Sequence, residues 1–303
     1  MQDRRTFIKS ASGALALGGL AYSNLSFILP GKTLPDPGVQ LFTFFNILDN
    51  DVEGVLRKAA EVGVKNIESA FSKKGDYYGL SAGEFSSLLQ DLGMKWRAHH
   101  VFGTPINLPP SKDTNGNPVP APKFKNLQEN LDQIIDEALE GGLEYLVAAH
   151  LPIGTASEIE TSLKILNKAA KATNSAGIQL VYHNEPADFK QVEGKVPYEV
   201  FLSETDPKAL KFELDFAWAV KGGIDPLSLI KRYPGRFPLW HIKDLDRTYE
   251  TVLPIGEGVL DNAKYFKSAQ ESGLKYYFIE HEAASDPLKS IAHSIDQLNE
   301  ITH

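Results

Sequence analysis

Residues 176–185 read Ala176-Gly177-Ile178-Gln179-Leu180-Val181-Tyr182-His183-Asn184-Glu185. A glycine closes a helix here, a β-rich run follows, and the run ends in an imidazole and a carboxylate. Glycine often ends helices because it adopts the left-handed conformation without steric cost, and the aliphatic residue after it begins a strand. The same kind of joint recurs at Val62–Lys65, Leu92–Lys95, Gly141–Glu144 and Ser272–Lys275. The chain is therefore expected to alternate helices with short strands.

Eight β-rich runs follow one another between amphipathic stretches. They span Gly38–Phe45, Lys65–Ala70, Lys95–Phe102, Glu144–Leu151, Ile178–Asn184, Lys211–Trp218, Phe237–Asp244 and Lys275–Glu282. Eight strand–helix units predict an α/β fold, a single (β/α)8 TIM barrel over residues 37–303. A doubly wound open sheet is the alternative, but it needs a glycine-rich phosphate loop after the first strand, and Phe45-Asn46-Ile47-Leu48 has no glycine. The non-periodic stretch Gly103–Pro122 would lie over the barrel mouth, as a substrate cover or as a tolerated insertion.

Composition narrows the range of partners. The 303 residues carry a net charge of −8, and no block of Lys and Arg is interleaved with aromatic residues. Nucleic acid is therefore not expected as a partner, since phosphate binding needs a concentrated basic face. These residues include no cysteine, which excludes disulfides, thiolate ligands and a cysteine nucleophile.

Residues 1–30 resemble a twin-arginine signal peptide with a linker. Asp3-Arg4-Arg5-Thr6-Phe7-Ile8-Lys9 precedes an apolar stretch, Ala11 to Ala21, that is too short to span a membrane. We therefore expect a periplasmic protein of a Gram-negative bacterium, exported by the twin-arginine route and without a stable membrane anchor. The alternative is a disordered basic start before a surface helix.

The last four predicted strands each end in polar side chains. They read His183-Asn184-Glu185, Glu213-Leu214-Asp215, His241-Ile242-Lys243 and Glu280-His281-Glu282. Alternation with a period of two turns the charged side chains of each strand toward one face, and the carboxyl ends of parallel strands converge in a barrel. Carboxylates with imidazoles suit one divalent metal ion, Mn, Co, Zn or Mg, with open positions for a substrate.

Roles within this set follow from position. The expected metal ligands are His183, Asp215, His241 and Glu280. Asp215 stands in an apolar run, where an unpaired charge is costly and a cation would compensate it, although it could also cap a following helix. The choices between His183 and Glu185, and between Glu280 and Glu282, stay open.

Other polar residues are candidates for catalysis and substrate binding. Glu185 and Glu282 are candidate proton-transfer bases. Lys243 would hold an oxyanion or phosphate, or would pair with an acid such as Asp215. The side chains at the ends of strands two, three and four would bind sugar hydroxyls or form structural hydrogen bonds: Glu68, His100 and His150.

The motifs together resemble the xylose-isomerase-like TIM barrels, the sugar phosphate isomerase/epimerase superfamily, from about Pro37 to the end. The resemblance is carried by Asn66-Ile67-Glu68, Tyr182-His183-Asn184-Glu185, Glu213-Leu214-Asp215 with Trp218-Ala219-Val220-Lys221, His241-Ile242-Lys243-Asp244, Ile255-Gly256-Glu257-Gly258 and Ile279-Glu280-His281-Glu282. In the sugar 3-epimerases of this group the metal is held by Glu, Asp, His and Glu at the ends of strands five to eight. The resemblance maps the last three onto Asp215, His241 and Glu280, and it adds Glu257 as a substrate-binding candidate.

The first ligand departs from that pattern. The chain looks more like an exported, twin-arginine-signal branch whose fifth strand reads Tyr-His-Asn-His, with Glu185 here in place of the second His. The resemblance implies a metal-dependent sugar isomerase or epimerase that acts on a keto-sugar or sugar derivative through a metal-stabilised enediolate. Glu185, Glu282 and Lys243 would be its catalytic residues, a small sugar its substrate, and a homo-oligomer is plausible.

Three alternatives remain. The same site would suit a 3-keto-glycoside lyase or hydratase. A non-catalytic periplasmic sugar-binding protein is a second reading, although buried acids at four strand ends are costly without a metal. A phosphodiesterase resembling the apurinic endonucleases is the third, and the acidic charge disfavours it.

Overall fold

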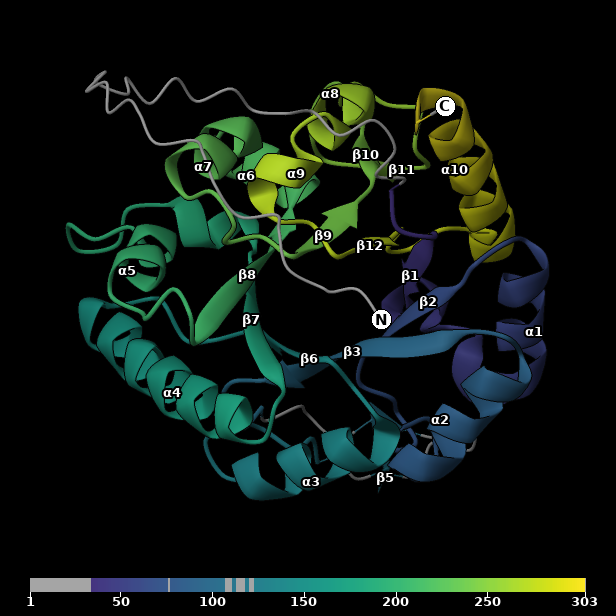
Figure 1. The fold of residues 1–303 in the computed structure, drawn as a ribbon, viewed down its shortest axis with the longest axis horizontal. Coiled ribbons are helices and arrows are strands. Elements are labelled where there is room, and N and C mark those ends of the chain that lie inside the picture. The colour runs from purple at the N-terminus through teal and green to yellow at the C-terminus, as the bar shows by residue number, and fades with distance from the viewer. Residues whose placement is uncertain (1–33, 76, 107–110, 113–117, 120–122, 303) are drawn as a thin grey trace, which may run out of the picture. The chain divides into compact units, whose positions relative to one another are not determined.

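The computed structural model describes residues 34–75, 77–106, 111–112, 118–119 and 123–302. The predicted signal peptide and most of the stretch 103–122 lie outside the described residues, so the predictions made for them stay predictions. Within the described part, strands and helices alternate, and the predicted barrel is confirmed (Figure 1).

Eight parallel strands close the barrel in the order β1-β12-β9-β8-β7-β6-β3-β2. Their bounds are β1 Gly38–Gln40, β2 Asn66–Ser69, β3 Lys95–Phe102, β6 Tyr145–Ala149, β7 Gln179–His183, β8 Leu210–Asp215, β9 Leu239–Ile242 and β12 Tyr276–Ile279. Two short antiparallel pairs lie outside the barrel sheet: β4 Ser111–Lys112 with β5 Pro118–Val119, and β10 Asp244–Leu245 with β11 Val252–Leu253.

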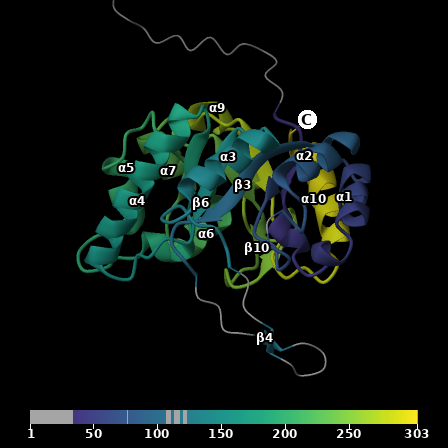
Figure 2. The ribbon, with the colours of Figure 1, turned by 90° about the horizontal axis from the view of Figure 1, so that it is seen from below.

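Helices surround the barrel and cover its outer face (Figures 1 and 2). They are α1 Val52–Glu61, α2 Ala82–Asp91, α3 Leu131–Gly141, α4 Ala156–Ser175, α5 Pro197–Ser203, α6 Phe216–Gly222, α7 Pro226–Arg232, α8 Asn262–Phe266, α9 Ala269–Ser272 and α10 Pro287–Thr302. The joint glycines take the expected left-handed conformation, as at Gly142 (φ 70°) and Gly177 (φ 81°). No helix among the described residues has the length and hydrophobicity needed to cross a membrane.

Several strands end earlier than the sequence-based prediction, and two of these ends have a clear local cause. The first strand stops at Gln40, where the side-chain oxygen accepts the backbone N–H of Phe42 and the chain turns into a 3-10 helix, Leu41–Phe44. The sixth strand stops at Asp215, whose carboxylate accepts the N–H of Trp218 and so starts α6. In both cases a polar side chain hydrogen-bonds the backbone two or three residues ahead, which favours a turn or helix start over an extended chain.

The barrel interior is divided into an apolar and a polar layer. A small apolar cluster inside it is formed by Ala98, Val147, Val181, Leu239 and Phe278. Two residues further along, on the same face, stand His100, His183, His241 and Glu280. The larger hydrophobic cluster packs between the strands and the helices. Since the inner face changes from apolar to charged toward the carboxyl ends, the charged layer opens at the barrel mouth.

Candidate metal centre and pocket

The four expected metal ligands converge in the polar layer. One ligand atom from each of His183, Asp215, His241 and Glu280 lies within 4.8 Å of all the others, and all four side chains are buried. His241 Nδ1 is 3.1 Å from both His183 Nε2 and Glu280 Oε2. Asp215 Oδ2 is 3.7 Å from His183 Nε2. Two imidazole nitrogens and two carboxylate oxygens at these separations fit a divalent ion.

Strand register and one asparagine explain this convergence. Asp215 of β8 stands directly beside His241 of β9 in the parallel ladder. The side chain of Asn184 accepts the N–H of Asp215 at 3.0 Å and donates to its carbonyl at 3.1 Å, which ties the end of β7 to the end of β8. Asp215 thus caps α6 with Oδ1 and faces the cluster with Oδ2. From the sequence, Asp215 was expected either to bind a metal or to cap the following helix. In the structure, one carboxylate oxygen is placed for each role.

Charge in the cluster is balanced partly by Lys243. Its ammonium is fully buried and lies 3.0 Å from Asp215, 2.6 Å from Glu280 and 2.5 Å from Glu282. Burial alone would lower the pKa of Lys243, but these three acids outweigh it and raise the pKa well above its usual value. Of the two roles expected for this lysine, the geometry shows the pairing with acids.

The imidazoles differ in their protonation. Burial lowers the pKa of His183 to about 4, so its ring is neutral near pH 7 and able to bind a metal. The pKa of His241 is raised well above its usual value, because the surrounding Glu213, Glu280 and Glu68 outweigh the effect of burial. A metal that binds His241 therefore displaces a proton.

A cavity of about 130 Å³ opens directly on this cluster. His183 and Glu280 form part of its wall, so the candidate ligands are reached from it. Its other lining residues are Phe42, Ala70, Phe71, His100, Ala149, His150, Glu185, Trp218 and Glu282. Among these described lining residues there is no Lys or Arg, while three aromatic faces and several hydrogen-bonding groups are present. That combination suits a small polyhydroxylated ring.

The two candidate bases line this cavity together. Burial, with Asp215 and Glu280 nearby, raises the pKa of Glu185 to about 8 against the opposing effect of Lys243. Burial and the neighbouring Glu280 raise the pKa of Glu282 to about 7. His150 also lines the cavity, with a φ of 55° that is uncommon outside glycine and is typical of functional positions.

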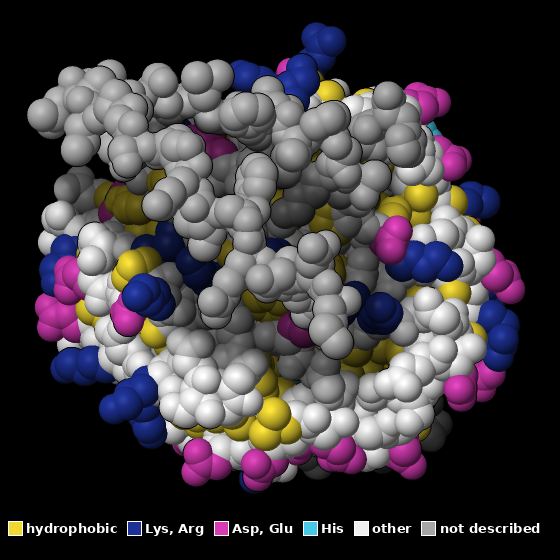
Figure 3. Space-filling view, viewed as in Figure 1, with side chains coloured by type: hydrophobic (Ala, Val, Ile, Leu, Met, Phe, Trp, Pro, Cys, Tyr) yellow, Lys and Arg dark blue, Asp and Glu magenta, His cyan; other side chains and the backbone are white. Residues whose placement is uncertain are grey.

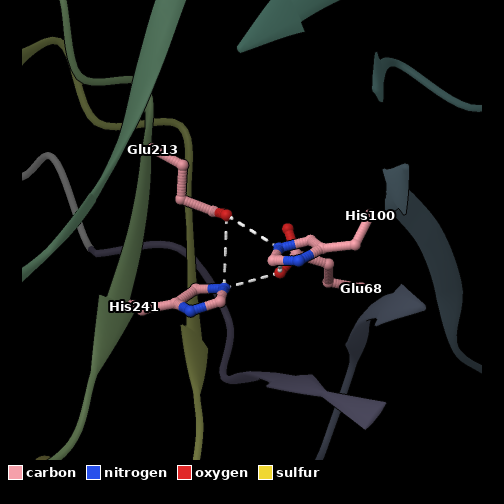
Figure 4. A group of neighbouring side chains, drawn as sticks. All are labelled: Glu68, His100, Glu213 and His241. Atoms are coloured by element: carbon pink, nitrogen blue, oxygen red, sulfur yellow. Dashed lines mark hydrogen bonds and ion pairs between the residues drawn. The ribbon is translucent and has the colours of Figure 1, made fainter. Parts of the chain in front are cut away.

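A second buried group lies beside the first and shares His241. In Figure 4, Glu68, His100, Glu213 and His241 point toward one another. His241 Nε2 is 2.6 Å from Glu68 Oε1 and 3.3 Å from Glu213 Oε2. His100 Nε2 is 3.0 Å and 3.1 Å from the same two carboxylates.

This group changes the placement of two residues. Glu68 is fully buried and is not among the residues that line the cavity, so the structure does not place it where a sugar hydroxyl would lie. Glu213 was given no role from the sequence, although it shares the face of Asp215 two residues earlier on β8. The period-two alternation of the sequence had already turned Glu213 toward the barrel interior, but it could not show that His100 and His241 are its partners there. His100 belongs to the group and also lines the cavity.

Glu257 lies away from the cavity. It is exposed, and its carboxylate is 3.5 Å from His293 of α10. The loop that carries it is held by the buried Asp244, which accepts the N–H groups of Gly256, Gly258 and Leu260. The structure therefore gives this motif a loop-organising role and does not place Glu257 at the cavity as expected.

The surface bears on nucleic-acid binding, which needs a concentrated basic face. In the space-filling view of Figure 3, both acidic and basic side chains lie around the rim, and acidic ones follow one another along its lower edge, without a continuous basic patch among the described residues on that face.

The chain is similar in sequence and in fold to several known proteins. An inosose dehydratase of Lacticaseibacillus casei is 26% identical over 170 residues, 50% of this chain and 56% of that protein, so the chain spans about half the length of the curated relatives it matches. A crystal structure of a sugar phosphate isomerase/epimerase from Parabacteroides distasonis ATCC 8503 is 26% identical, with a TM-score of 0.70 over 88% of this chain and 98% of that one. The structure of the IOLI protein with a bound zinc atom shares the fold at 15% identity, with a TM-score of 0.65 over 88% of this chain and 98% of that one. A family model matches residues 56–301, and the chain belongs to the xylose isomerase-like TIM barrel family.

Proposed function

We propose that this protein is a metal-dependent enzyme that removes a proton next to the carbonyl of a neutral keto-sugar or related cyclic keto-polyol. The observation that carries the proposal is the cluster of His183, Asp215, His241 and Glu280 at the wall of a cavity that Glu185 and Glu282 also line. A divalent ion held by the four residues would supply Lewis acidity for the negative charge that develops on the carbonyl oxygen.

The protein's own residues account for the other parts of the step. A carboxylate takes the proton from the carbon beside the carbonyl, and the electron pair of that C–H bond moves toward the carbonyl oxygen. Glu282 is the better base, because its pairing with Lys243 at 2.5 Å favours the ionised form. Glu185, with its pKa raised to about 8, would be the acid that returns a proton.

The substrate is proposed to be neutral. Three carboxylates line the cavity without a Lys or Arg among its described lining residues, and the nearby Lys243 already contacts three acids. A phosphate group there would meet like charges, which is destabilising. The aromatic faces of Phe42, Phe71 and Trp218 would pack against the C–H faces of a sugar ring.

Two outcomes share this first step. Return of the proton to either face or to the neighbouring carbon gives epimerisation or isomerisation. Loss of a hydroxyl or alkoxyl group from the next carbon, protonated by Glu185, gives elimination. The match to inosose dehydratases over half of the chain supports elimination as the second candidate.

Deuterium exchange tests the shared step. The protein with Mn²⁺ is incubated in D₂O with an inosose, a free ketohexose and a 3-keto-glucoside, and the products are followed by NMR. Deuterium should appear at the carbon next to the carbonyl of at least one substrate, and loss of water or of the glycosidic group identifies elimination. Absence of exchange for all three, together with sugar binding that survives EDTA, would favour a non-catalytic binding protein.

A further inference from the structure

Both ring nitrogens of His241 are engaged, on opposite sides of a fully buried ring. Nδ1 faces the candidate metal cluster, 3.1 Å from Glu280 Oε2. Nε2 faces away from it, 2.6 Å from Glu68 Oε1. A neutral imidazole carries its proton on only one nitrogen, so the group that accepts from Nε2 decides which nitrogen has a free lone pair.

Glu68 is itself held in a defined position by Gln40. The side-chain oxygen of Gln40 accepts the backbone N–H of Phe42 at 3.0 Å, which leaves its amide nitrogen as the atom that faces Glu68. That nitrogen donates to Glu68 Oε1 at 2.6 Å. The bond to the Phe42 N–H fixes the orientation of the Gln40 amide, so Gln40 can only donate to Glu68. Glu68 Oε1 is therefore held as an acceptor on the side that His241 approaches.

His100 supports the same arrangement from the side. Its ring lies nearly parallel to that of His241, with centroids 5.4 Å apart and an interplanar angle of 3°. Its Nε2 is within 3.1 Å of both Glu68 and Glu213. Stacking on His100 therefore restricts tilting of the His241 ring, and the hydrogen bond to Glu68 restricts its rotation.

From this geometry we propose that Glu68, oriented by Gln40, is a positioning residue that holds His241 with its proton on Nε2 and directs the Nδ1 lone pair at the metal. The proposal rests on the metal centre of the proposed function. Carboxylates that accept from the distal nitrogen of a metal-binding histidine fix its tautomer and orientation, and their loss weakens metal binding by about 10- to 100-fold.

The alternative interpretation of this buried group is a second metal site, formed by Glu68, His100, Glu213 and His241. It is disfavoured because Glu68 Oε1 already lies against Gln40 Nε2, a group that can only donate. It would also require His241 to bind one ion through each nitrogen. Binding of two ions per chain at saturation would therefore overturn the proposal.

The experiment measures tautomer and metal affinity separately. Protein labelled with ¹⁵N in its histidines is examined by long-range ¹H–¹⁵N NMR without metal, at a pH above the raised pKa of His241, where its ring is neutral and has one tautomer. His241 is assigned by its absence in His241→Gln. Affinity and stoichiometry come from Co²⁺ titration followed by absorption. The variants are Glu68→Met, which removes the acceptor, Glu68→Gln, which keeps an acceptor oxygen, and Gln40→Met.

Wild type should show the Nε2–H form of His241 and one Co²⁺ per chain. Glu68→Met should give mixed tautomers and about 10- to 100-fold weaker Co²⁺ binding, with most of the affinity restored in Glu68→Gln and a smaller loss in Gln40→Met. Glu137→Gln is the control, since that acid of α3 contacts Tyr77 and Lys125 and is in neither His–acid group, and it should bind as wild type.

Unchanged tautomer and affinity in Glu68→Met would overturn the inference. If Glu68→Met does not fold, Gln40→Met and Glu68→Gln replace it. The ¹⁵N chemical shift of His241 Nε2 must then differ from the wild-type value in each of these two variants. A wild type that binds no Co²⁺ would refute the metal centre of the proposed function, whereas the tautomer of metal-free His241 still decides the role of Glu68.

Discussion

At the scale of single residues, the candidate site depends on charges that are buried and closely paired. Asp215 illustrates this, because one carboxylate oxygen caps α6 and the other faces His183 and Lys243. Substitutions that keep the shape and remove the charge can therefore separate metal binding from folding.

Asp215→Asn should weaken metal binding by more than about 100-fold with a modest loss of stability, because the amide oxygen still accepts the N–H of Trp218. Metal content by elemental analysis and unfolding by urea would measure the two effects. Asp225→Asn is the control, since Asp225 also caps a helix with its carboxylate, at the exposed start of α7, and has no part in the metal cluster. Equal metal content in both variants would refute the assignment of Asp215.

Glu282→Gln and Glu185→Gln should each lower kcat by about 10²- to 10⁴-fold while the metal stays bound, because each removes a proton-transfer group and leaves the four ligands intact. Turnover of the substrate identified by deuterium exchange would be compared with that of Glu250→Gln, an exposed acid paired with Lys221. If Glu282→Gln still exchanges deuterium at the wild-type rate, Glu282 is not the base.

At the scale of elements, side chains that bond to nearby backbone decide where strands stop and how loops are held. The loop after β10 is the clearest case. The carboxylate of Asp244 accepts four backbone N–H groups, from Leu245, Gly256, Gly258 and Leu260. A Cβ on Gly258 would lie 2.2 Å from Asp244 Oδ1, so this close approach needs glycine.

Asp244→Ala should destabilise the protein by about 2–4 kcal/mol, because one buried and three part-buried N–H groups lose their acceptor. Asp246→Ala is the matched control, since Asp246 bonds to the backbone of Glu250 and Thr251 in an exposed turn where water can replace it. Urea unfolding should show a much smaller loss of stability for Asp246→Ala than for Asp244→Ala. Equal losses would mean that burial of the Asp244 bonds contributes little.

His99, on the outward face of β3, should make stability depend on pH. Burial, with a smaller effect of His100, lowers its pKa to about 3, and its Nδ1 lies 2.8 Å from Ser69 Oγ. Between pH 6.5 and 3 the unfolded chain binds a proton that the folded ring does not, so stability falls as pH falls.

Wild type should therefore lose about 1.4 kcal/mol per pH unit more than His99→Gln below pH 6. Urea unfolding of both proteins at pH 7, 6 and 5 would test this. Parallel stability curves would show that His99 is protonated in the folded protein as easily as in the unfolded one.

At the scale of the whole molecule, the ends of strands far apart in the sequence meet at one cluster. His183, Asp215, His241 and Glu280 come from β7, β8, β9 and the residue after β12, so an ion there would link half of the barrel. Export by the twin-arginine route stays a proposal, because the signal lies outside the described residues.

Metal binding should stabilise the whole barrel. At a free metal concentration of 100 times Kd, the gain is about 2.7 kcal/mol, or roughly 5 °C in Tm for a domain of this size. Thermal unfolding with Co²⁺ and with EDTA would measure it, and Asp215→Asn should show no such gain. A Tm that EDTA leaves unchanged in metal-loaded protein would argue against the centre.

The sequence by itself determined the alternation of strands and helices, the left-handed glycine joints and the face to which His183, Asp215, His241 and Glu280 point. Those features depend on local periodicity and backbone preference, which neighbouring residues encode. Only the tertiary structure decided that Glu68 lies behind His241, that Lys243 pairs with three acids and that Glu257 is exposed. Periodicity sets the face of a side chain, whereas its depth in the barrel and its partners on distant strands follow from strand register and closure.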